Sequence, residues 1–295
     1  MTRFYLESFP AWVPPVGSPV GSSRQTGEAA GWLPVLEELS VMHRVRTTRC
    51  LVVSGIIGGA GVASAQPVLL DDGFEGYAVG ELPSGPWEDT TSRIDAPTVA
   101  SPTATVVSTT DAFGNATRAV QTVDAIGTSS GVLAGFSPVA ASRLSVDLRI
   151  DQFTDVAQGA TWSAAVGFLQ DSAAADLNQG PQAVVYASVG VPTYRMFVLN
   201  NGRAFDFAIP GAAIELDRWV TVGIAMDSVA GTVEASVSDP LTGALIGEAS
   251  RTFSGWSAAD AQYDAVAFFD GEYQTVGGTL GGPATLDNVE LVVIP

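Results

Sequence analysis

A two-residue alternation of apolar and polar side chains runs through the chain from about residue 67 to its end. In one clear segment, every second residue is apolar: Leu144, Val146, Leu148 and Ile150. Successive side chains of a β-strand point to opposite faces, so this alternation predicts strands with one buried face. No segment shows a convincing 3.6-residue period. The chain is therefore predicted to be all-β.

Turn residues separate the predicted strands. Asn200, Asn201 and Gly202 tolerate positive φ, so they predict a hairpin. Turns rich in Gly, Ser, Asp and Pro at 228–231 and 239–243 connect further strands. The predicted strands are 67–71, 104–109, 117–123, 131–136, 143–150, 161–169, 183–189, 194–199, 204–209, 219–226, 231–238, 245–252, 264–269 and 284–293. So many short strands without helices predict two packed antiparallel sheets in a single domain, residues 66–295.

The segment 42–65 has the order of a secretory signal peptide. Basic residues up to Arg49 precede a short apolar run from Cys50 to Ala63, and Ala63-Ser64-Ala65 forms an Ala-x-Ala cleavage site. We therefore expect export from a bacterial cell, to the medium or the cell surface, with cleavage before Gln66. Residues 1–41 are interpreted as an upstream extension or a disordered leader. Cleavage would remove the only His and the only Cys of the chain.

The chain is strongly acidic. Its formal net charge is −18, it has no Lys, and all 13 basic residues are Arg. Such a surface repels nucleic acid and anionic lipid, and it disfavours polyanionic glycans unless Arg residues cluster locally. We expect no nucleic-acid partner and no membrane insertion after signal cleavage. The sequence leaves the oligomeric state open.

Three groups of motifs carry a family resemblance. The segment 70–77 reads Leu-Asp-Asp-Gly-Phe-Glu-Gly-Tyr, the segment 217–227 contains an Asp-Arg-Trp start followed by alternation, and 284–291 reads Ala-Thr-Leu-Asp-Asn-Val-Glu-Leu. Together they resemble the concanavalin A-like, laminin-G-like jelly rolls of secreted bacterial proteins. The resemblance implies a two-sheet antiparallel jelly-roll sandwich. It does not choose among lectins, binding modules, hydrolases and lyases.

No complete catalytic group is expected in the exported part. Without His, Cys or Lys it lacks Ser-His-Asp and Cys-His nucleophiles and zinc sites of His or Cys. The β-glucanases of this fold carry Glu-x-Asp-x-x-Glu, whereas the nearest match here, 215–220, ends in Val220. The segment around Tyr273 is similar to a lyase motif but has no His partner. A glycoside hydrolase or polysaccharide lyase therefore stays an alternative.

The resemblance also implies a structural calcium ion. In related sandwiches an acid of the opening strand and an Asp of the closing strand share the ion. Glu75 and Asp287 match by motif, with Asp72 as a third candidate. Carboxylate oxygens are ligands that calcium prefers. The alternative is that Asp71 and Asp72 are exposed turn residues and that Asp287 accepts a hydrogen bond from a neighbouring backbone N–H.

Sugar binding needs aromatic rings flanked by polar groups. Trp219 is expected in the core and is set aside. A secreted, non-catalytic domain that binds a polysaccharide or a cell-surface glycan, or another surface partner, is the leading hypothesis. A structural protein of the envelope or extracellular matrix is the further alternative. The candidate ligand-binding residues are Trp87, Trp162, Tyr186, Tyr194, Arg195 and Tyr273.

Overall fold

Antiparallel strands and turns make up the part of the chain that the computed structural model describes, namely residues 66–89, 104–122, 131–151, 162–170, 182–188, 193–200, 203–253, 263–271 and 283–294. All of them belong to one compact unit, Gly61–Pro295. The predicted extension 1–41 and signal peptide 42–65 lie outside the described residues, so export and cleavage stay predictions. None of the described segments is a helix of the length and apolarity needed to cross a bilayer.

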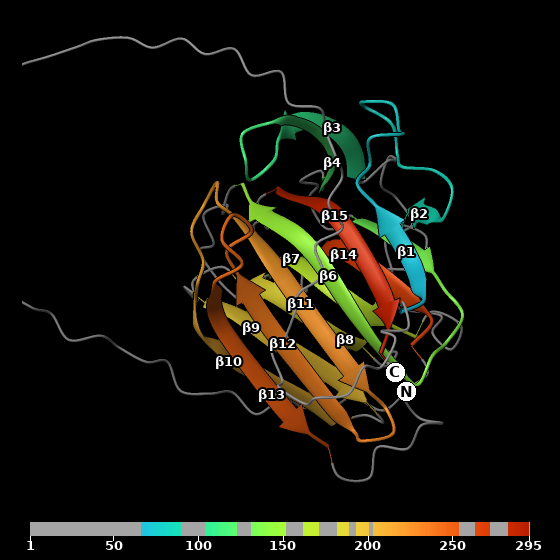
Figure 1. Cartoon of the computed structure of the whole chain (residues 1–295), viewed down its shortest axis with the longest axis vertical. Helices are drawn as coiled ribbons and strands as arrows, with labels where there is room; N and C mark the ends of the chain where they lie inside the picture. Colours follow the sequence, from blue (N-terminus) through green and yellow to red (C-terminus); the bar gives the residue numbers. More distant parts are fainter. Residues whose placement is uncertain are drawn as a thin grey trace, which may run out of the picture. The chain divides into compact units, whose positions relative to one another are not determined.

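The described strands form two sheets, as predicted (Figure 1). The eight-stranded sheet has the order β13 (Leu245–Thr252), β12 (Thr232–Ser238), β11 (Trp219–Asp227), β6 (Ala141–Ile150), β15 (Ala284–Val293), β4 (Ala116–Thr122) and β3 (Ala104–Thr110), and β1 (Val68–Asp72) also pairs with β15. The seven-stranded sheet has the order β10 (Arg203–Ala213), β9 (Thr193–Asn200), β8 (Gln182–Ser188), β7 (Trp162–Leu169), β14 (Ala265–Gly271), β5 (Gly131–Gly135) and β2 (Trp87–Asp89).

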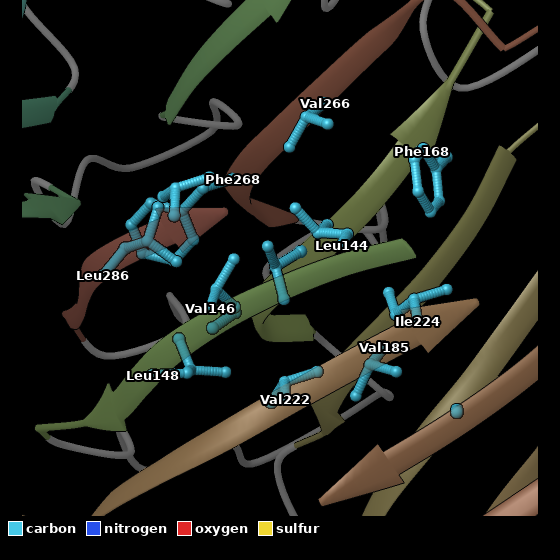
Figure 2. Packing of buried hydrophobic residues seen from close by; sticks show 14 of the residues in the cluster. Leu144, Val146, Leu148, Phe168, Val185, Val222, Ile224, Val266, Phe268 and Leu286 are labelled. Atoms are coloured by element: carbon cyan, nitrogen blue, oxygen red, sulfur yellow. The ribbon is translucent and has the colours of Figure 1, made fainter. Parts of the chain in front are cut away.

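The main core fills the space between the sheets (Figure 2). In β6 the alternation predicted from sequence places Leu144, Val146 and Leu148 on the core face with no exposed surface. They meet apolar residues of the opposite sheet such as Phe168 and Val185. Each such side chain contributes about 1.5 to 3 kcal/mol on full burial, so the alternation determines which face of each strand turns inward.

The predicted hairpins are confirmed by the strand pairing. β9 and β10 pair from Asn200 and Arg203 onward, and β11 pairs with β12, which in turn pairs with β13. The short strand β2 was not predicted, because three residues are too few to show an alternation.

Trp219 was expected in the core: its ring is buried, as expected, but it does not belong to the main core between the sheets. The core-facing residues of β11 begin with Val220, so Trp219 points to the opposite face of the eight-stranded sheet. It is nevertheless only 8% exposed. The guanidinium carbon of Arg149 lies 4.9 Å from the ring centroid, and the indole Nε1 donates to the carbonyl of Thr110 at 2.8 Å. The end of β3 therefore covers this ring from outside the core.

The two ends of the sandwich domain meet on one strand. β1 pairs with the second half of β15, while β4 pairs with its first half, at Thr285 and Leu286. In the middle of β15, from Asp287 to Glu290, the register against β6 shifts, and Asn288 has a φ of 49°. Such a bulge locally re-aims side chains. The adjacency of the opening and closing motifs, implied by the resemblance, is confirmed.

We expect Tyr194→Phe to leave the free energy of unfolding unchanged or to raise it by up to about 1 kcal/mol. Tyr194 is fully buried, and its hydroxyl has no hydrogen-bond partner within the described part of the chain. Burial also raises the pKa of this phenol, which keeps it neutral. Urea denaturation measures the effect. Tyr77→Phe is the control, because the Tyr77 hydroxyl donates to Asp72; a clear loss of stability in Tyr194→Phe would contradict the expectation.

Candidate functional site

Two polar clusters of the described part of the chain contain residues that were predicted as site residues. The first, here called the strand junction, consists of Asp72, Glu75, Thr117 and Asp287, where β1 and β4 meet β15. The second, here called the outer-face triad, consists of Tyr186, Arg195 and Asp206 on the face of the seven-stranded sheet that points away from the main core. The first contains the predicted metal ligands, and the second contains two of the predicted ligand-binding residues.

Asp72 is a hydrogen-bond acceptor that holds the opening loop. Its Oδ1 accepts from the backbone N–H of Phe74 at 2.8 Å, and its Oδ2 accepts from the Tyr77 hydroxyl at 2.6 Å and from Trp87 Nε1 at 2.8 Å. Burial, with the bond to Asp72 and its charge, raises the pKa of Tyr77 to about 12, so this phenol stays a donor. Three donors thus contact the oxygens of Asp72, and the hydrogen bonds of the described residues do not link Asp72 to Glu75 or Asp287. Its role as a third metal ligand stays a prediction.

Glu75 and Asp287 share one hydroxyl group. Thr117 Oγ1 lies 2.8 Å from Glu75 Oε1 and 3.2 Å from Asp287 Oδ2. Asp287 is 1% exposed, and burial raises the pKa of its carboxyl to about 7, with the charges of Asp147 and Glu75 adding to the effect. A threonine has one hydroxyl hydrogen. When that hydrogen goes to Glu75, a protonated Asp287 donates its own proton to Thr117.

Neighbouring groups complete the strand junction. Asp147 lies opposite Asp287 on β6 and accepts from Thr221 Oγ1 at 2.6 Å and from Asn288 Nδ2 at 2.9 Å. The guanidinium of Arg118 donates to the backbone carbonyls of Glu75 and Tyr77. Within residues that the structure describes, no three acidic, His or Cys side chains are grouped to hold a metal ion.

Asp287 makes the hydrogen bond that was the alternative to a calcium site. Its Oδ1 accepts from the backbone N–H of Asn288 at 2.8 Å. Its other oxygen, Oδ2, still faces Glu75 across Thr117. Of the three predicted acid ligands, Glu75 and Asp287 thus face each other across one hydroxyl group, and the calcium ion stays a prediction.

The outer-face triad is a connected set of three side chains on β8, β9 and β10. Tyr186 hydroxyl donates to Asp206 Oδ1 at 2.9 Å, and Arg195 Nε lies 2.9 Å from the same oxygen and 3.0 Å from the Tyr186 hydroxyl. Burial, followed by the charge of Asp206, raises the pKa of Tyr186 above its usual value, so the phenol keeps its hydrogen. The side chains of Arg195 and Asp206 are 24% and 43% exposed, whereas Tyr186 is 4% exposed.

Strand pairing places the triad at the edge of a second, buried apolar cluster. Tyr186 stands opposite Arg195 on β9 and opposite Ala165 on β7, and Asp206 stands opposite Phe197. These residues share a face with a second buried apolar cluster, separate from the main core. Its members are Leu133, Ala165, Leu169, Val184, Tyr186, Ala265, Ala267 and Phe269, with Phe197 packed against them and partly buried.

The other predicted ligand-binding residues lie elsewhere. Trp87 and Tyr194 belong to the main core, with 4% and 0% exposure, so neither ring is offered to a ligand. Trp162 begins β7, but its side chain is outside the described part, as is the whole of Tyr273. The prediction did not include Asp206. Pairing counted back from Asn200 and Arg203 would have placed it diagonally across from Arg195 on the same face.

The acids of the glucanase-like segment do not lie on a strand. Glu215 and Asp217 precede β11, and Asp217 has a positive φ of 59°. Glu215 pairs with Arg218 at 2.8 Å. The period of two that would place catalytic acids on one face therefore does not apply to these residues.

Comparison with known proteins identifies the architecture. No family model and no curated protein matches the sequence. An endo-1,3-β-glucanase from Streptomyces sioyaensis is similar in structure, with 14% identity, a TM-score of 0.50, and coverage of 81% of this chain and 100% of that one. A structure from a description of endo-acting O-glycanases of the human gut microbiota is similar too, with 15% identity, a TM-score of 0.51, and coverage of 78% and 100%. The sandwich formed by this chain has the concanavalin A-like jelly-roll fold.

Proposed function

We propose that this protein is exported and binds glycans, without cleaving them, at the outer-face triad. The observation that carries the proposal is the bonded set of Tyr186, Arg195 and Asp206 on the outward face of a concanavalin A-like sheet. The fold by itself hosts both binding modules and enzymes. The choice between them therefore rests on the chemistry of the residues on this face.

The exposed part of the triad has the chemistry of a sugar-binding site. Asp206 supplies carboxylate oxygens that accept from sugar hydroxyls, and Arg195 supplies guanidinium N–H donors. Their bonds to each other and to Tyr186 hold both groups in place before a ligand arrives. Such preorganisation reduces the entropy lost on binding. The other members of the second cluster are buried, but Phe197 is only partly buried, and its ring suits the C–H face of a sugar ring.

Hydrolysis of a glycosidic bond by the usual route needs two carboxyl groups about 5 to 10 Å apart. On this face, the described acids are Asp206 on β10 and Glu88, which stands opposite Leu133 at the other edge of the sheet. Six strand spacings of about 4.8 Å separate their strands, which is roughly 29 Å. These two acids do not form a catalytic pair, which favours binding over hydrolysis.

A glycan array probed with the full-length protein tests the proposal. We expect binding to at least one polysaccharide or oligosaccharide, and we expect no new reducing ends and no unsaturated products when the same glycans are incubated with the protein. Turnover of a bound glycan would support the alternative of a carbohydrate-active enzyme. The absence of binding across plant, marine and mucin-type glycans would contradict the proposal and favour a structural role.

We also propose that calcium binds at the strand junction through Glu75 and Asp287. The support is a buried carboxylate that faces a second one across a shared hydroxyl. Two ionised carboxylates in such a position repel each other, and a divalent cation would convert that repulsion into attraction. Because Glu75 follows β1 and Asp287 lies on β15, the ion would join the first and last strands of the sandwich.

A further inference from the structure

Resting on the proposed glycan-binding function, we infer that the ligand of the outer-face triad is an electrically neutral sugar with two adjacent hydroxyl groups, rather than a uronate or a sulfated sugar.

The charge of the triad is already balanced. Arg195 Nε lies 2.9 Å from Asp206 Oδ1, so the cation and the anion neutralise each other. Strand pairing shows which described side chains lie on this face. Among them, the only charged residue besides Arg195 and Asp206 is Glu88, at the far edge of the sheet. An anionic sugar placed here would meet no uncompensated positive charge, and it would bring a second anion close to Asp206, which costs free energy as water is excluded.

The polar atoms that remain match a pair of hydroxyl groups. The bonds that Arg195 and Asp206 make to described residues use only Nε of the first and Oδ1 of the second. The two terminal nitrogens of Arg195 are left as donors, and Oδ2 of Asp206 is left as an acceptor. One sugar hydroxyl can donate to Oδ2 while its neighbour accepts from the guanidinium. A sugar carboxylate or sulfate has no hydrogen to give to Oδ2.

An aromatic ring adjoins this donor and acceptor. Phe197 stands directly opposite Asp206 across the β9–β10 ladder and two residues after Arg195 on the same face. Directly opposed side chains of an antiparallel pair have Cβ atoms about 4.5 to 5.5 Å apart. A sugar ring whose hydroxyls engage Arg195 and Asp206 would therefore lie within reach of Phe197, which suits the apolar face of a neutral pyranose.

The charge of the whole chain supports the same ligand class. With a net charge of −18, the protein repels a polyanion during approach. Arg149 pairs with Asp151, and Arg218 pairs with Glu215 and Asp239. A neutral polysaccharide meets no such repulsion.

The test is isothermal titration of the full-length protein with two sets of oligosaccharides: neutral ones (β-glucan, mannan and xylan fragments) and acidic ones (alginate, polygalacturonate and sulfated galactan fragments). We expect a neutral set member to bind with a Kd that changes less than about twofold between 50 and 500 mM NaCl, because no counterions are released. Acidic sugars should bind at least about tenfold more weakly.

Charge variants sharpen the test. Arg195→Gln and Asp206→Asn should each weaken binding of the neutral sugar by about tenfold or more, since each removes one of the two hydroxyl partners. Asp206→Asn also leaves Arg195 unpaired, so it should gain weak, salt-sensitive binding of acidic sugars. Arg143→Gln and Glu234→Gln make the same charge changes at exposed positions of the other sheet, and they should leave the Kd unchanged within about twofold.

Each outcome decides a different point. Tighter, salt-sensitive binding of acidic sugars by the wild-type protein would overturn this inference and leave glycan binding standing. Absence of binding in both sets would overturn the proposed function itself. Neutral-sugar binding that survives Arg195→Gln and Asp206→Asn would place the site elsewhere and overturn the inference. Arg195→Lys, which keeps the charge but loses the fork of donors, is the second variant if either fails to fold, and it should also weaken binding.

Discussion

Replacing Asp72 with alanine is expected to lower the free energy of unfolding by about 3 to 5 kcal/mol. The change removes the common acceptor of three donors: the Phe74 backbone N–H, the Tyr77 hydroxyl and Trp87 Nε1. Hydrogen bonds to a charged group contribute about 1.5 to 3 kcal/mol each, although the three losses are not additive. Trp87 is only 4% exposed, so its indole N–H is left without compensation by bulk water.

The loss should also loosen an aromatic group at the edge of the core. Phe74 has a φ of 58°, an uncommon conformation for a bulky residue, and its ring is fully buried. Its centroid lies 5.4 Å from that of Trp87 and 6.1 Å from that of Tyr77. Asp72 accepts hydrogen bonds from the backbone of Phe74 and from the side chains of Tyr77 and Trp87, so it holds these three residues together. Tryptophan fluorescence during urea denaturation reports on both stability and the loss of packing.

Asp71→Ala is the matched control. The same residue type precedes Asp72 on β1, but its side chain is exposed, and we expect its replacement to change stability by less than about 0.5 kcal/mol. Asp72→Asn should lie between the two, because an amide oxygen can still accept from Phe74 while the amide nitrogen cannot accept from Tyr77 or Trp87. Equal stability of Asp71→Ala and Asp72→Ala would contradict the role assigned to Asp72.

The sandwich could be predicted from sequence because one physical rule governs most of it. Burial of one face per strand produces the alternation in β6 and β11, and turn residues such as Asn200 and Gly202 mark where strands reverse. The expectation for Trp219 failed because strands of the same sheet also bury a side chain on its outer face. Trp219 is buried like a core residue, but Arg149 and the carbonyl of Thr110 bury it from outside the core.

The two candidate sites differ in how far their strand pairing can be predicted from sequence. Arg195 and Asp206 belong to one hairpin, so their proximity follows from counting the register from the turn. Thr117 and Asp287 are 170 residues apart in sequence. For this contact, β4 must pair with β15 only near the start of β15, and β15 must then form a bulge. No local sequence pattern indicates either feature. Thr117 was therefore not predicted, although Glu75 and Asp287 were.

In the presence of a chelator, wild-type protein is expected to lose stability as the pH rises from about 4 to about 7. The cause is the buried carboxyl group of Asp287. Burial raises the pKa of this carboxyl from 3.8 to about 7 in the folded state. Within this window the folded state holds a proton that the unfolded state has released, so stability is complete below the window and falls across it. The loss from this group amounts to at most about 4 kcal/mol.

Asp287→Asn isolates this contribution. An asparagine does not titrate, its Oδ1 still accepts from the Asn288 N–H, and its amide can donate to Thr117. We expect the variant and wild type to melt within a few degrees of each other at pH 4. At pH 8 the variant should melt higher by at most about 8 to 16 °C, since the loss is at most about 4 kcal/mol and 1 kcal/mol corresponds to roughly 2 to 4 °C for a domain of this size. Asp71→Asn, which removes an exposed charge, should follow wild type at both values.

Calcium should reverse this difference at pH 8. An ion held by ionised Glu75 and Asp287 binds only the folded state, and at a hundredfold excess over its Kd it stabilises that state by about 2.7 kcal/mol. Wild type should then melt higher with calcium than with chelator at pH 8 but not at pH 4, where protonated Asp287 cannot act as a ligand. Asp287→Asn should show no calcium effect at either pH. If calcium does not change the melting temperature while the difference between pH 4 and pH 8 persists, the strand junction holds a proton and not a metal ion. If the difference between the two pH values is also absent, Asp287 is an ordinary ionised carboxylate whose hydrogen bonds offset its burial.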